Sequence, residues 1–271
     1  MQAGRNQELE EQDKRIETAL GNIKNRVVVF SGKGGVGKTT VSVNLAYALI
    51  QKKKGTGLLD ADITGPNVPQ MVGIDEKPTF MDEHAILPMK KEGLHLVSMA
   101  ALVPKDQPVI WRGPLRSGVI GQFLGDVVWG DLDFLLADLP PGTGDEVLTA
   151  AQKMKPQMAI VVTTPQEVSL IDCRRAVTMA KKLNIPQIGI VENMAGLVCP
   201  HCSEVIDLFS QGGGKKLAEE MSVDYLGSIP MEVAVREGGD AGSPIVLAAS
   251  ESLSAQAIVG IGENVIDLLS A

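Results

Sequence analysis

The segment from Gly32 to Thr40 carries the residue types and spacing that indicate the most specific chemistry in the chain. Its first eight residues fit the pattern G-x-x-x-x-G-K-[ST] without a mismatch. Glycines let backbone N–H groups approach phosphate oxygens, and the N-terminus of a following helix favours anions. Lys38 supplies a charge for the β- and γ-phosphates, and the hydroxyl of Thr39 is a suitable Mg²⁺ ligand. The nucleotide-contacting residues predicted here are Gly32, Lys33, Gly34, Gly35, Val36, Gly37, Lys38, Thr39 and Thr40.

The elements around this segment favour phosphate binding over a glycine-rich turn that carries a lysine by chance. The β-branched run Val27–Phe30 predicts a buried strand, and a helical pattern begins at Thr40. A strand, a glycine loop and a helix in this order are what the phosphate-binding motif requires.

Carboxylates follow two further apolar runs, at Asp60 and Asp62 and at Asp138. The carboxyl ends of parallel strands form the ligand-binding edge of doubly wound sheets, so we expect these side chains near the phosphates. We assign Asp62 to orienting the attacking water, Asp60 to supporting Mg²⁺ through water, and Asp138 to holding Mg²⁺. The backbone N–H of Gly142 could sense the γ-phosphate. The alternative for these loops is simple turn formation.

Two residues at the ends of later predicted strands are candidates for contact with the nucleotide base. The amide of Asn193 can both donate to and accept from an adenine edge. A strand-end turn explains this residue type almost equally well. Pro230 follows the last predicted strand, and we expect it to border the adenine.

Cys199 and Cys202 form a C-x-x-C pair, which is a common metal-ligand spacing. Two thiolates cannot complete a tetrahedral site or hold a four-iron cluster, because both need four ligands. A symmetric dimer would supply four thiolates from two copies. His201 is a third candidate ligand, whereas Cys173 falls in a predicted helix and is expected to be buried.

Other chemistries also fit an isolated cysteine pair: a redox dithiol, a structural zinc site, a regulatory disulfide or coincidence. A redox C-x-x-C normally opens a helix in a thioredoxin-like βαβ unit, which the sequence does not predict here. Zinc shared across the same dimer is not excluded by ligand type. On its own the cysteine pair is a weak signal for a metal site, and its combination with the phosphate loop makes that signal stronger.

The elements that must position these residues indicate one doubly wound α/β domain with a mostly parallel sheet of about seven strands. Aromatic residues make up 3% of the chain, so the core must be aliphatic, which suits parallel strands covered by helices. We predict that the P-loop domain spans residues 25–271 and that residues 1–24 form a helical extension. The predicted strands are Val27–Phe30, Leu58–Leu59, Leu94–Ser98, Phe134–Asp138, Met158–Val162, Gln187–Val191 and Tyr225–Ile229.

Composition excludes several classes of protein. The net charge of −8 argues against a large nucleic-acid-binding surface. No apolar run approaches the ~20 residues that span a bilayer, and the polar N-terminus lacks the apolar segment of a secretory signal. Three cysteines in 271 residues do not form a disulfide framework, so we expect a reducing cytoplasm.

Lys33 follows the first glycine of the loop, where an ordinary phosphate loop needs no lysine. It could be a solvated loop charge, but this leaves its position unexplained. The loop resembles the deviant phosphate loop of the ParA/MinD/nitrogenase iron protein class, in which this lysine crosses a dimer interface to the partner's nucleotide. Together with the cysteine pair, it makes the chain similar to the Mrp/ApbC-type iron–sulfur carrier ATPases. The resemblance is carried by Ser31–Thr40, Asp60–Pro69, Trp111–Pro114, Asp138–Asp145, Asn193–Met194, Cys199–Cys202, Gln211–Gly214 and Ile229–Pro244.

The resemblance implies a homodimer that sandwiches two ATP molecules with Mg²⁺ and bridges a [4Fe–4S] cluster through Cys199 and Cys202. It also implies cluster transfer to apo-proteins under the control of ATP hydrolysis, with Lys33, Lys38 and Asp62 as catalytic residues. Neither nucleic acid nor a membrane is an expected partner. The main rival is a MinD/ParA-like positioning ATPase without a metal cluster. It predicts a basic amphipathic C-terminus or a basic face, and neither is evident; a third hypothesis is a reductase like the nitrogenase iron protein.

Overall fold

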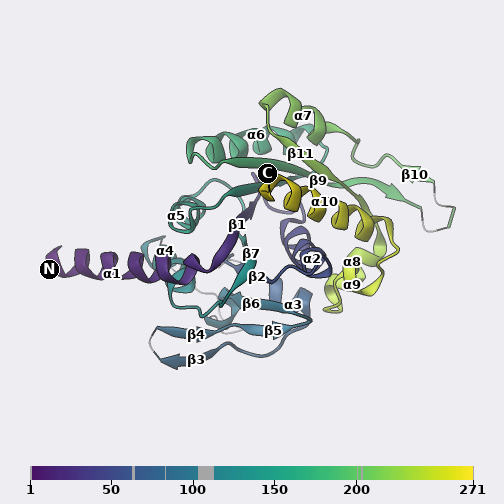
Figure 1. The fold of residues 1–271 in the computed structure, drawn as a ribbon. Helices are drawn as coiled ribbons and strands as arrows, with labels where there is room; N and C mark the ends of the chain where they lie inside the picture. The colour runs from purple at the N-terminus through teal and green to yellow at the C-terminus, as the bar shows by residue number, and fades with distance from the viewer. Residues whose placement is uncertain are drawn as a thin grey trace.

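The computed structural model of the chain describes residues 2–62, 65–82, 84–102, 113–199, 201–202 and 204–270. Its architecture is a twisted, mostly parallel sheet with helices on both faces (Figure 1). The strands are β1 (Ile23–Phe30), β2 (Thr56–Asp60), β3 (Thr79–Asp82), β4 (Ala85–Leu87), β5 (Met89–Lys91), β6 (Leu94–Ser98), β7 (Leu132–Asp138), β8 (Met158–Thr163), β9 (Gln187–Val198), β10 (Val205–Ile206) and β11 (Asp224–Met231).

The main sheet contains nine strands in the order β10-β9-β8-β1-β7-β2-β6-β5, with β11 also paired to β9. Seven of these strands run parallel, and they correspond to the seven that the sequence predicts. The predicted doubly wound α/β fold is therefore confirmed. The short strands β5 and β10 add antiparallel pairs at β6 and β9, and β3 and β4 form a separate hairpin.

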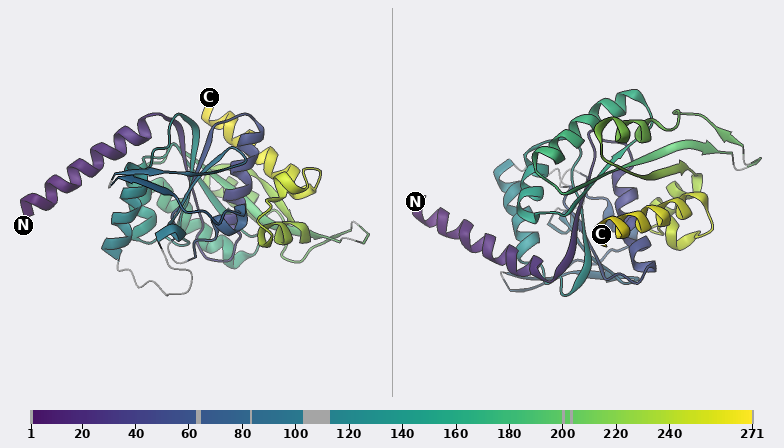
Figure 2. Two further views of the ribbon diagram at one scale, coloured as in Figure 1. Left: turned by 90° about the horizontal axis from the view of Figure 1, so that it is seen from below. Right: turned by 45° about the horizontal axis from the view of Figure 1, so that its top comes forward.

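Helices cover both faces of the sheet, as the views in Figure 2 also show. Along β1, Val28 and Phe30 belong to one hydrophobic cluster and Val27 and Val29 to the other, because successive strand residues point to opposite faces. The first cluster includes residues of α1, α4, α5, α6 and α7, and the second includes residues of α2, α3, α9 and α10. The helices are α1 (Gln2–Gly21), α2 (Lys38–Gln51), α3 (Val68–Val72), α4 (Gly113–Gly125), α5 (Asp145–Met154), α6 (Glu167–Lys182), α7 (Gly213–Met221), α8 (Val233–Asp240), α9 (Ile245–Ala248) and α10 (Leu253–Ser270), with a 3₁₀ turn at Met99–Leu102.

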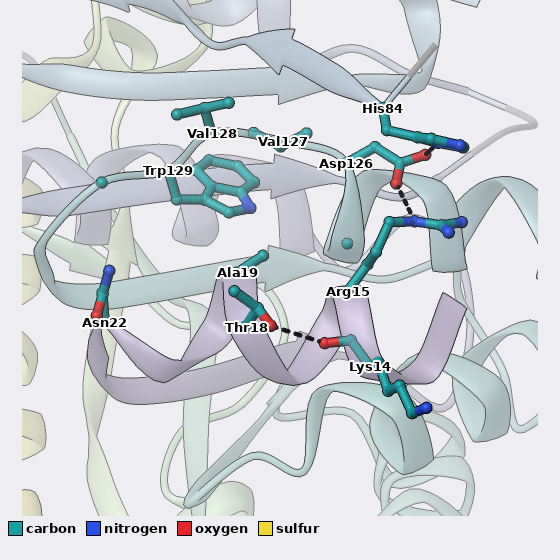
Figure 3. Close-up of a pocket in the computed structure, with 12 residues that line it drawn as sticks. Lys14, Arg15, Thr18, Ala19, Asn22, His84, Asp126, Val127, Val128 and Trp129 are labelled. Carbon is teal, nitrogen blue, oxygen red and sulfur yellow. Dashed lines mark hydrogen bonds and ion pairs between the residues drawn. The ribbon is translucent and has the colours of Figure 1, made fainter. Parts of the chain in front are cut away.

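The N-terminal helix α1 projects from the body at its start and packs into the body at its end (Figure 2). Ile16 and Leu20 are 3% exposed and belong to the core, whereas Leu9 is 49% exposed. Nε of Arg15 donates to Oδ1 of Asp126 at 2.9 Å, which ties α1 to the turn after α4 (Figure 3). The role of residues 1–24 as a separate extension stays a prediction. None of the helices in the described ranges has the length and apolarity needed to cross a bilayer.

The buried end of α1 generates a prediction about stability. Leu20→Ala should lower the free energy of unfolding by about 2–5 kcal/mol, because it removes buried methyl groups and leaves a cavity. Leu9→Ala, the matched control on the exposed half of the same helix, should change it by less than about 0.5 kcal/mol. Urea unfolding followed by circular dichroism measures both values, and equal effects would contradict the packing of α1.

Candidate nucleotide and metal sites

The predicted phosphate loop lies where three strands end, at the carboxyl edge of the sheet. The register pairs Asp138 with Val29 of β1 and with Asp60 of β2, so both carboxylates lie beside the loop that follows β1. The loop reaches α2 through Gly37, whose φ of 78° lies in the left-handed region and favours glycine. The backbone thus directs the N-terminus of α2 toward this edge, where an anion can bind.

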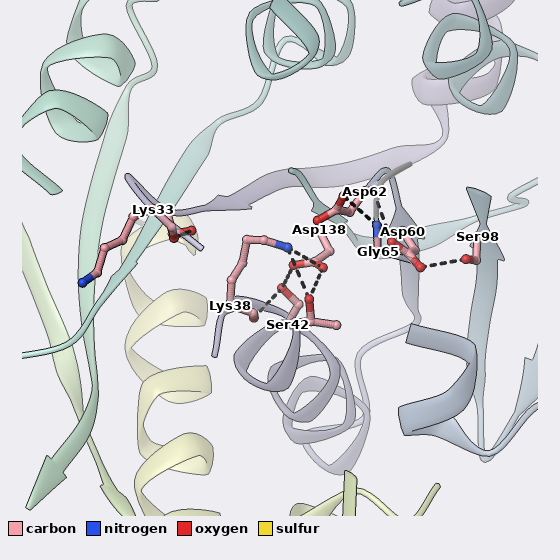
Figure 4. A network of polar contacts seen from close by, with 10 residues as sticks. Lys33, Lys38, Ser42, Asp60, Asp62, Gly65, Ser98 and Asp138 are labelled. Atoms are coloured by element: carbon pink, nitrogen blue, oxygen red, sulfur yellow. Dashed lines mark hydrogen bonds and ion pairs between the residues drawn. The ribbon is translucent and has the colours of Figure 1, made fainter. Parts of the chain in front are cut away.

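Asp138 accepts hydrogen bonds from three side chains of the first two turns of α2 (Figure 4). Nζ of Lys38 lies 2.7 Å from Oδ2, Oγ1 of Thr39 lies 2.8 Å from Oδ2, and Oγ of Ser42 lies 2.6 Å from Oδ1. The Asp138 side chain is fully buried, and that of Lys38 is 7% exposed. Sequence reasoning did not find Ser42, although its position one helical turn after Lys38 is a signal that could have indicated it.

The second carboxylate, Asp60, is completely buried and is held by a serine from the neighbouring strand. Oγ of Ser98 donates to Oδ2 of Asp60 at 2.7 Å, and the N–H of Asp62 lies 3.3 Å from Oδ1. Burial and, secondarily, the charge of Asp138 raise the pKa of Asp60 to about 7, against the opposing effects of Ser98 and Lys38. The N–H of Gly65 lies 3.3 Å from Oδ1 of Asp62, which is 8% exposed.

The loop after β7 is bonded to the segment that opens the phosphate loop. The N–H of Gly142 donates to the carbonyl of Ser31 at 2.8 Å, so this predicted phosphate sensor has a protein partner here. The hydroxyl of Ser31 in turn donates to the carbonyl of Lys33 at 2.8 Å. The side chain of Lys33 points away from Lys38 and its carboxylate partner, as Figure 4 shows. The first of these bonds joins the loop after β7 to the start of the phosphate loop, and the second lies within the phosphate loop itself.

Asn193 contacts the phosphate loop directly. Its Nδ2 donates to the carbonyl of Val36 at 2.9 Å, and a Cβ on Gly37 would lie 2.2 Å from the same nitrogen. Pro230 is close by, because β9 and β11 pair Asn193 with Ile229. The structure therefore brings both predicted base-contacting residues to one side of the loop.

β9 continues beyond Asn193 to the cysteine pair. The pairing of β9 with β11 shifts register after Asn193, and the backbone of Met194 has a φ of 59°. Beyond this bulge, β9 pairs with β10 to form a hairpin that projects from the body (Figure 1). Cys199 follows β9 directly, and its N–H donates to the carbonyl of Glu204 at 2.9 Å.

The two cysteines of the pair are accessible, and the remaining cysteine is not. Cys202 is exposed and Cys199 is partly exposed, whereas burial raises the pKa of the Cys173 thiol to about 12. Hydrogen bonds from the backbone N–H groups of His201 and Cys202, and from the Cys202 thiol, lower the pKa of the Cys199 thiol. Among the described residues, no three His, Cys, Asp or Glu side chains converge to hold a metal ion.

Glu192 is a buried carboxylate that the sequence did not single out. It is 1% exposed and accepts hydrogen bonds from the N–H groups of Gly212 and Gly214, at the start of α7. A carboxylate at a helix N-terminus satisfies free N–H groups and complements the helix dipole. Trp111 and Arg112 of the predicted Trp111–Pro114 motif lie outside the described residues, as does Pro200 of the C-x-x-C segment.

Comparison with known proteins agrees with this geometry. Residues 22–266 match the ParA family described as NUBPL iron-transfer P-loop NTPase. The chain belongs to this family. A Methanocaldococcus jannaschii protein named iron-sulfur cluster carrier protein is 52% identical over 243 residues, which cover 88% of this chain and 83% of the relative. Membership confirms the resemblance to iron–sulfur carrier NTPases inferred from the phosphate loop and the cysteine pair.

Solved structures agree with the NTPase fold. A nucleotide-binding protein from Archaeoglobus fulgidus in complex with ADP is 37% identical, with a TM-score of 0.77 and coverage of 89% of this chain and 94% of that chain. The cell division ATPase MinD of Pyrococcus furiosus is 26% identical, with a TM-score of 0.69 and coverage of 90% and 99%. This NUBPL-type chain therefore shares its fold with MinD, so the fold alone does not separate the carrier hypothesis from the rival hypothesis of a positioning ATPase.

The raised pKa of Asp60 generates a prediction about pH. Between about pH 4 and pH 7 the folded protein binds more protons at Asp60 than the unfolded chain does. The stability that protonation of Asp60 contributes to the folded state is therefore lost as pH rises through this range. We therefore compare the free energy of unfolding of Asp60→Asn with that of the unmodified chain, without nucleotide and with a chelator present. The effect of the substitution should be more stabilising at pH 8 than at pH 4.5, by up to about 4 kcal/mol. Urea unfolding at the two pH values measures this difference.

The matched control for this prediction is Asp267→Asn, because Asp267 is an exposed carboxylate near the end of α10. It should leave the pH dependence of stability close to that of the unmodified chain. If Asp60→Asn and Asp267→Asn give the same profile, burial does not hold Asp60 in its protonated form.

Proposed function

We propose that the chain is an ATP-hydrolysing iron–sulfur cluster carrier that acts as a homodimer in the cytoplasm. Two copies would hold one [4Fe–4S] cluster through Cys199 and Cys202 of each copy and deliver it to apo-proteins. The observation that carries the proposal is the course of β9, which contacts the phosphate loop through Asn193 and ends directly before Cys199. The family and the name of the archaeal relative support the same activity.

The residues around Asp138 suit a magnesium–nucleotide complex. The hydroxyls of Thr39 and Ser42 each lie within hydrogen-bond distance of the Asp138 carboxylate. All three groups are hard oxygen donors, which is the donor type that Mg²⁺ prefers. Bound Mg²⁺ would neutralise phosphate charge that develops during hydrolysis. Lys38 would exchange its ion pair with Asp138 for the β- and γ-phosphates, and Gly32–Thr40 would surround them with backbone N–H groups.

Hydrolysis would proceed by attack of water on the γ-phosphorus. Asp62 would orient this water, and the bond from the γ-phosphorus to the bridging oxygen would break, leaving ADP with the electron pair. Lys33 of the partner copy would stabilise the transferring group, which agrees with a side chain that points away from its own site. Asp60 would support the magnesium through water, and Asn193 and Pro230 would border the adenine.

The cluster would be cargo held by four thiolates, two from each copy. Four cysteine ligands are the usual set for a [4Fe–4S] cluster, and a twofold axis lets identical loops supply them. The hydrogen bonds that lower the pKa of the Cys199 thiol favour the thiolate that iron binds. Exposure of Cys202 on the projecting hairpin is consistent with transfer to another protein.

Lys33→Ala should reduce kcat for ATP hydrolysis by about 100-fold or more, because it removes a charge from the transition state. Binding of ADP should change little, since the removed side chain serves the other copy. Phosphate release measures the first quantity, and titration with a fluorescent ADP analogue measures the second. Lys182→Ala, which removes an exposed lysine at the end of α6, is the matched control and should retain full activity.

Mixing two inactive variants tests whether Lys33 acts across the dimer. A mixed dimer of Lys33→Ala and Asp62→Ala copies contains one site in which both residues are intact. Equal mixing should therefore restore about a quarter of the unmodified rate. No recovery, with mixed dimers demonstrated by mass, would show that Lys33 serves its own site.

Cys199→Ala should abolish cluster binding after anaerobic reconstitution, because only two of the four required thiolates, one Cys202 from each copy, would remain in the dimer. Iron and sulfide analysis, with the visible charge-transfer absorbance, measures the bound cluster. Cys173→Ala is the matched control and should retain it, because Cys173 is buried away from the pair. A protein that binds zinc but no sulfide, or equal loss in both variants, would contradict cluster carriage.

A further inference from the structure

The buried side chain of Glu192 has no part in the hydrolysis described above, yet it holds a glycine turn against β9. Its two oxygens accept from the N–H of Gly212, at 2.9 Å, and from the N–H of Gly214. This turn opens α7, which packs against α6 and β9 (Figure 1). The first N–H groups of a helix have no partner within the helix, so the bonds to Glu192 attach the start of α7 to the strand.

The attachment comes where the sheet stops supporting β9 on one side. The ladder between β8 and β9 ends with the pair of Thr163 and Glu192. In the described part of the sheet, Asn193 is therefore paired only with Ile229 of β11, and the register shifts after that pair. Glu192 thus anchors the strand directly before the residue at which the ladder on one side has ended.

The side chain of Asn193 lies on the opposite face of the strand, because successive strand residues alternate between faces. Its Nδ2 donates to the carbonyl of Val36 at 2.9 Å and lies against Gly37, as described above. Glu192 therefore contacts the helix layer on one face, and its neighbour contacts the phosphate loop on the other. An anchor at Glu192 fixes the place from which the Asn193 amide reaches the loop.

The same turn is packed on α6, which contacts the other end of the phosphate loop. A Cβ on Gly213 would lie 2.7 Å from the carbonyl oxygen of Pro165, just before α6. Within α6, the carbonyl oxygen of Asp172 would lie 2.2 Å from a Cβ on Gly32. Such distances leave no room for a side chain, so the backbones are in direct contact. The turn that Glu192 holds therefore joins two elements that contact the loop at its two ends.

We propose that Glu192 is a positioning residue for the nucleotide and that it acts on the phosphate loop through Asn193. By attaching β9 to the start of α7, it fixes the amide that supports the carbonyl of Val36. The loop is thereby held in one shape before a nucleotide binds, and such preorganisation strengthens binding because less ordering is needed. The inference rests on nucleotide binding, which is part of the proposed function.

Glu192→Gln should weaken the binding of ADP with Mg²⁺ by about tenfold. Glutamine has the same length, but its NH₂ group cannot accept a hydrogen bond, so one of the two bonds to the turn is lost. Titration with a fluorescent ADP analogue measures the affinity, and circular dichroism shows whether the variant is folded. Glu219→Gln, which removes an exposed carboxylate from α7, is the matched control and should bind as the unmodified chain does.

A double-mutant cycle tests whether Glu192 acts through Asn193. Asn193→Ala should itself weaken ADP binding by about tenfold, because it removes the bond to Val36. In a chain that already carries Asn193→Ala, Glu192→Gln should change the affinity by less than about twofold. A role in stability alone would instead lower the midpoint of thermal unfolding and leave the affinity of the folded protein unchanged.

A second variant disturbs the same contact from the turn and decides the question if Glu192→Gln does not fold. A Cβ on Gly214 would lie 3.0 Å from Cβ of Glu192 and 3.1 Å from its Oε2. Gly214→Ala should therefore displace the carboxylate, while alanine suits the helix better than glycine does. It should weaken ADP binding by about threefold, and only in a chain that retains Asn193.

The proposal is overturned if the deciding variant, once folded, binds ADP as tightly as the unmodified chain. It is also overturned if that variant weakens binding equally with and without Asn193→Ala. Both results leave ADP binding by the unmodified chain intact, so they do not affect the proposed function. If the unmodified chain does not bind ADP, the proposed function fails and this inference fails with it.

Discussion

The buried contact between Lys38 and Asp138 is the interaction on which the rest of the nucleotide edge depends. Neither charge is tolerated alone at this depth, and Thr39 and Ser42 complete the hydrogen bonds of the carboxylate. The contact joins the start of α2 to the end of β7 and thereby closes the base of the loop after β1. A ligand that draws Lys38 away must leave a compensating cation beside Asp138, and a magnesium–nucleotide complex meets both conditions.

The parallel strands of the main sheet could be predicted from the sequence because of their runs of aliphatic residues. Six of the seven parallel strands contain an apolar run that is buried by helices on both faces, and such runs are recognisable without neighbours. In the seventh, β11, only Leu226 and Ile229 are buried. The strands β5 and β10 span three and two residues, so they carry no periodic pattern. The hairpin of β3 and β4 was missed for a related reason: all four residues of β3 are exposed, and only pairing with β4 defines it.

In the candidate site, motifs that are contiguous in sequence could be predicted, whereas contacts between residues far apart in sequence could not. Gly32–Thr40 and the aspartates at strand ends were predicted because their signal is contiguous in sequence. Ser98 was missed because it reaches Asp60 only through the register of β2 against β6, which pairs these two positions. Glu192 was missed because its partners belong to a turn about twenty residues later. The catalytic roles of Lys33 and Asp62 stay predictions, since they require a second copy and a nucleotide.

The single strand that connects Asn193 to Cys199 has a consequence for how this part of the chain can vary. Side chains alternate between the two faces of a strand, so adding or deleting one residue would turn the thiol of Cys199 toward the opposite face. The spacer between the amide of Asn193 and the cysteine pair must therefore change by even steps or not at all. Substitution along β9 beyond the bulge is constrained only by packing, whereas its length is constrained by the direction in which the sulfur atoms face.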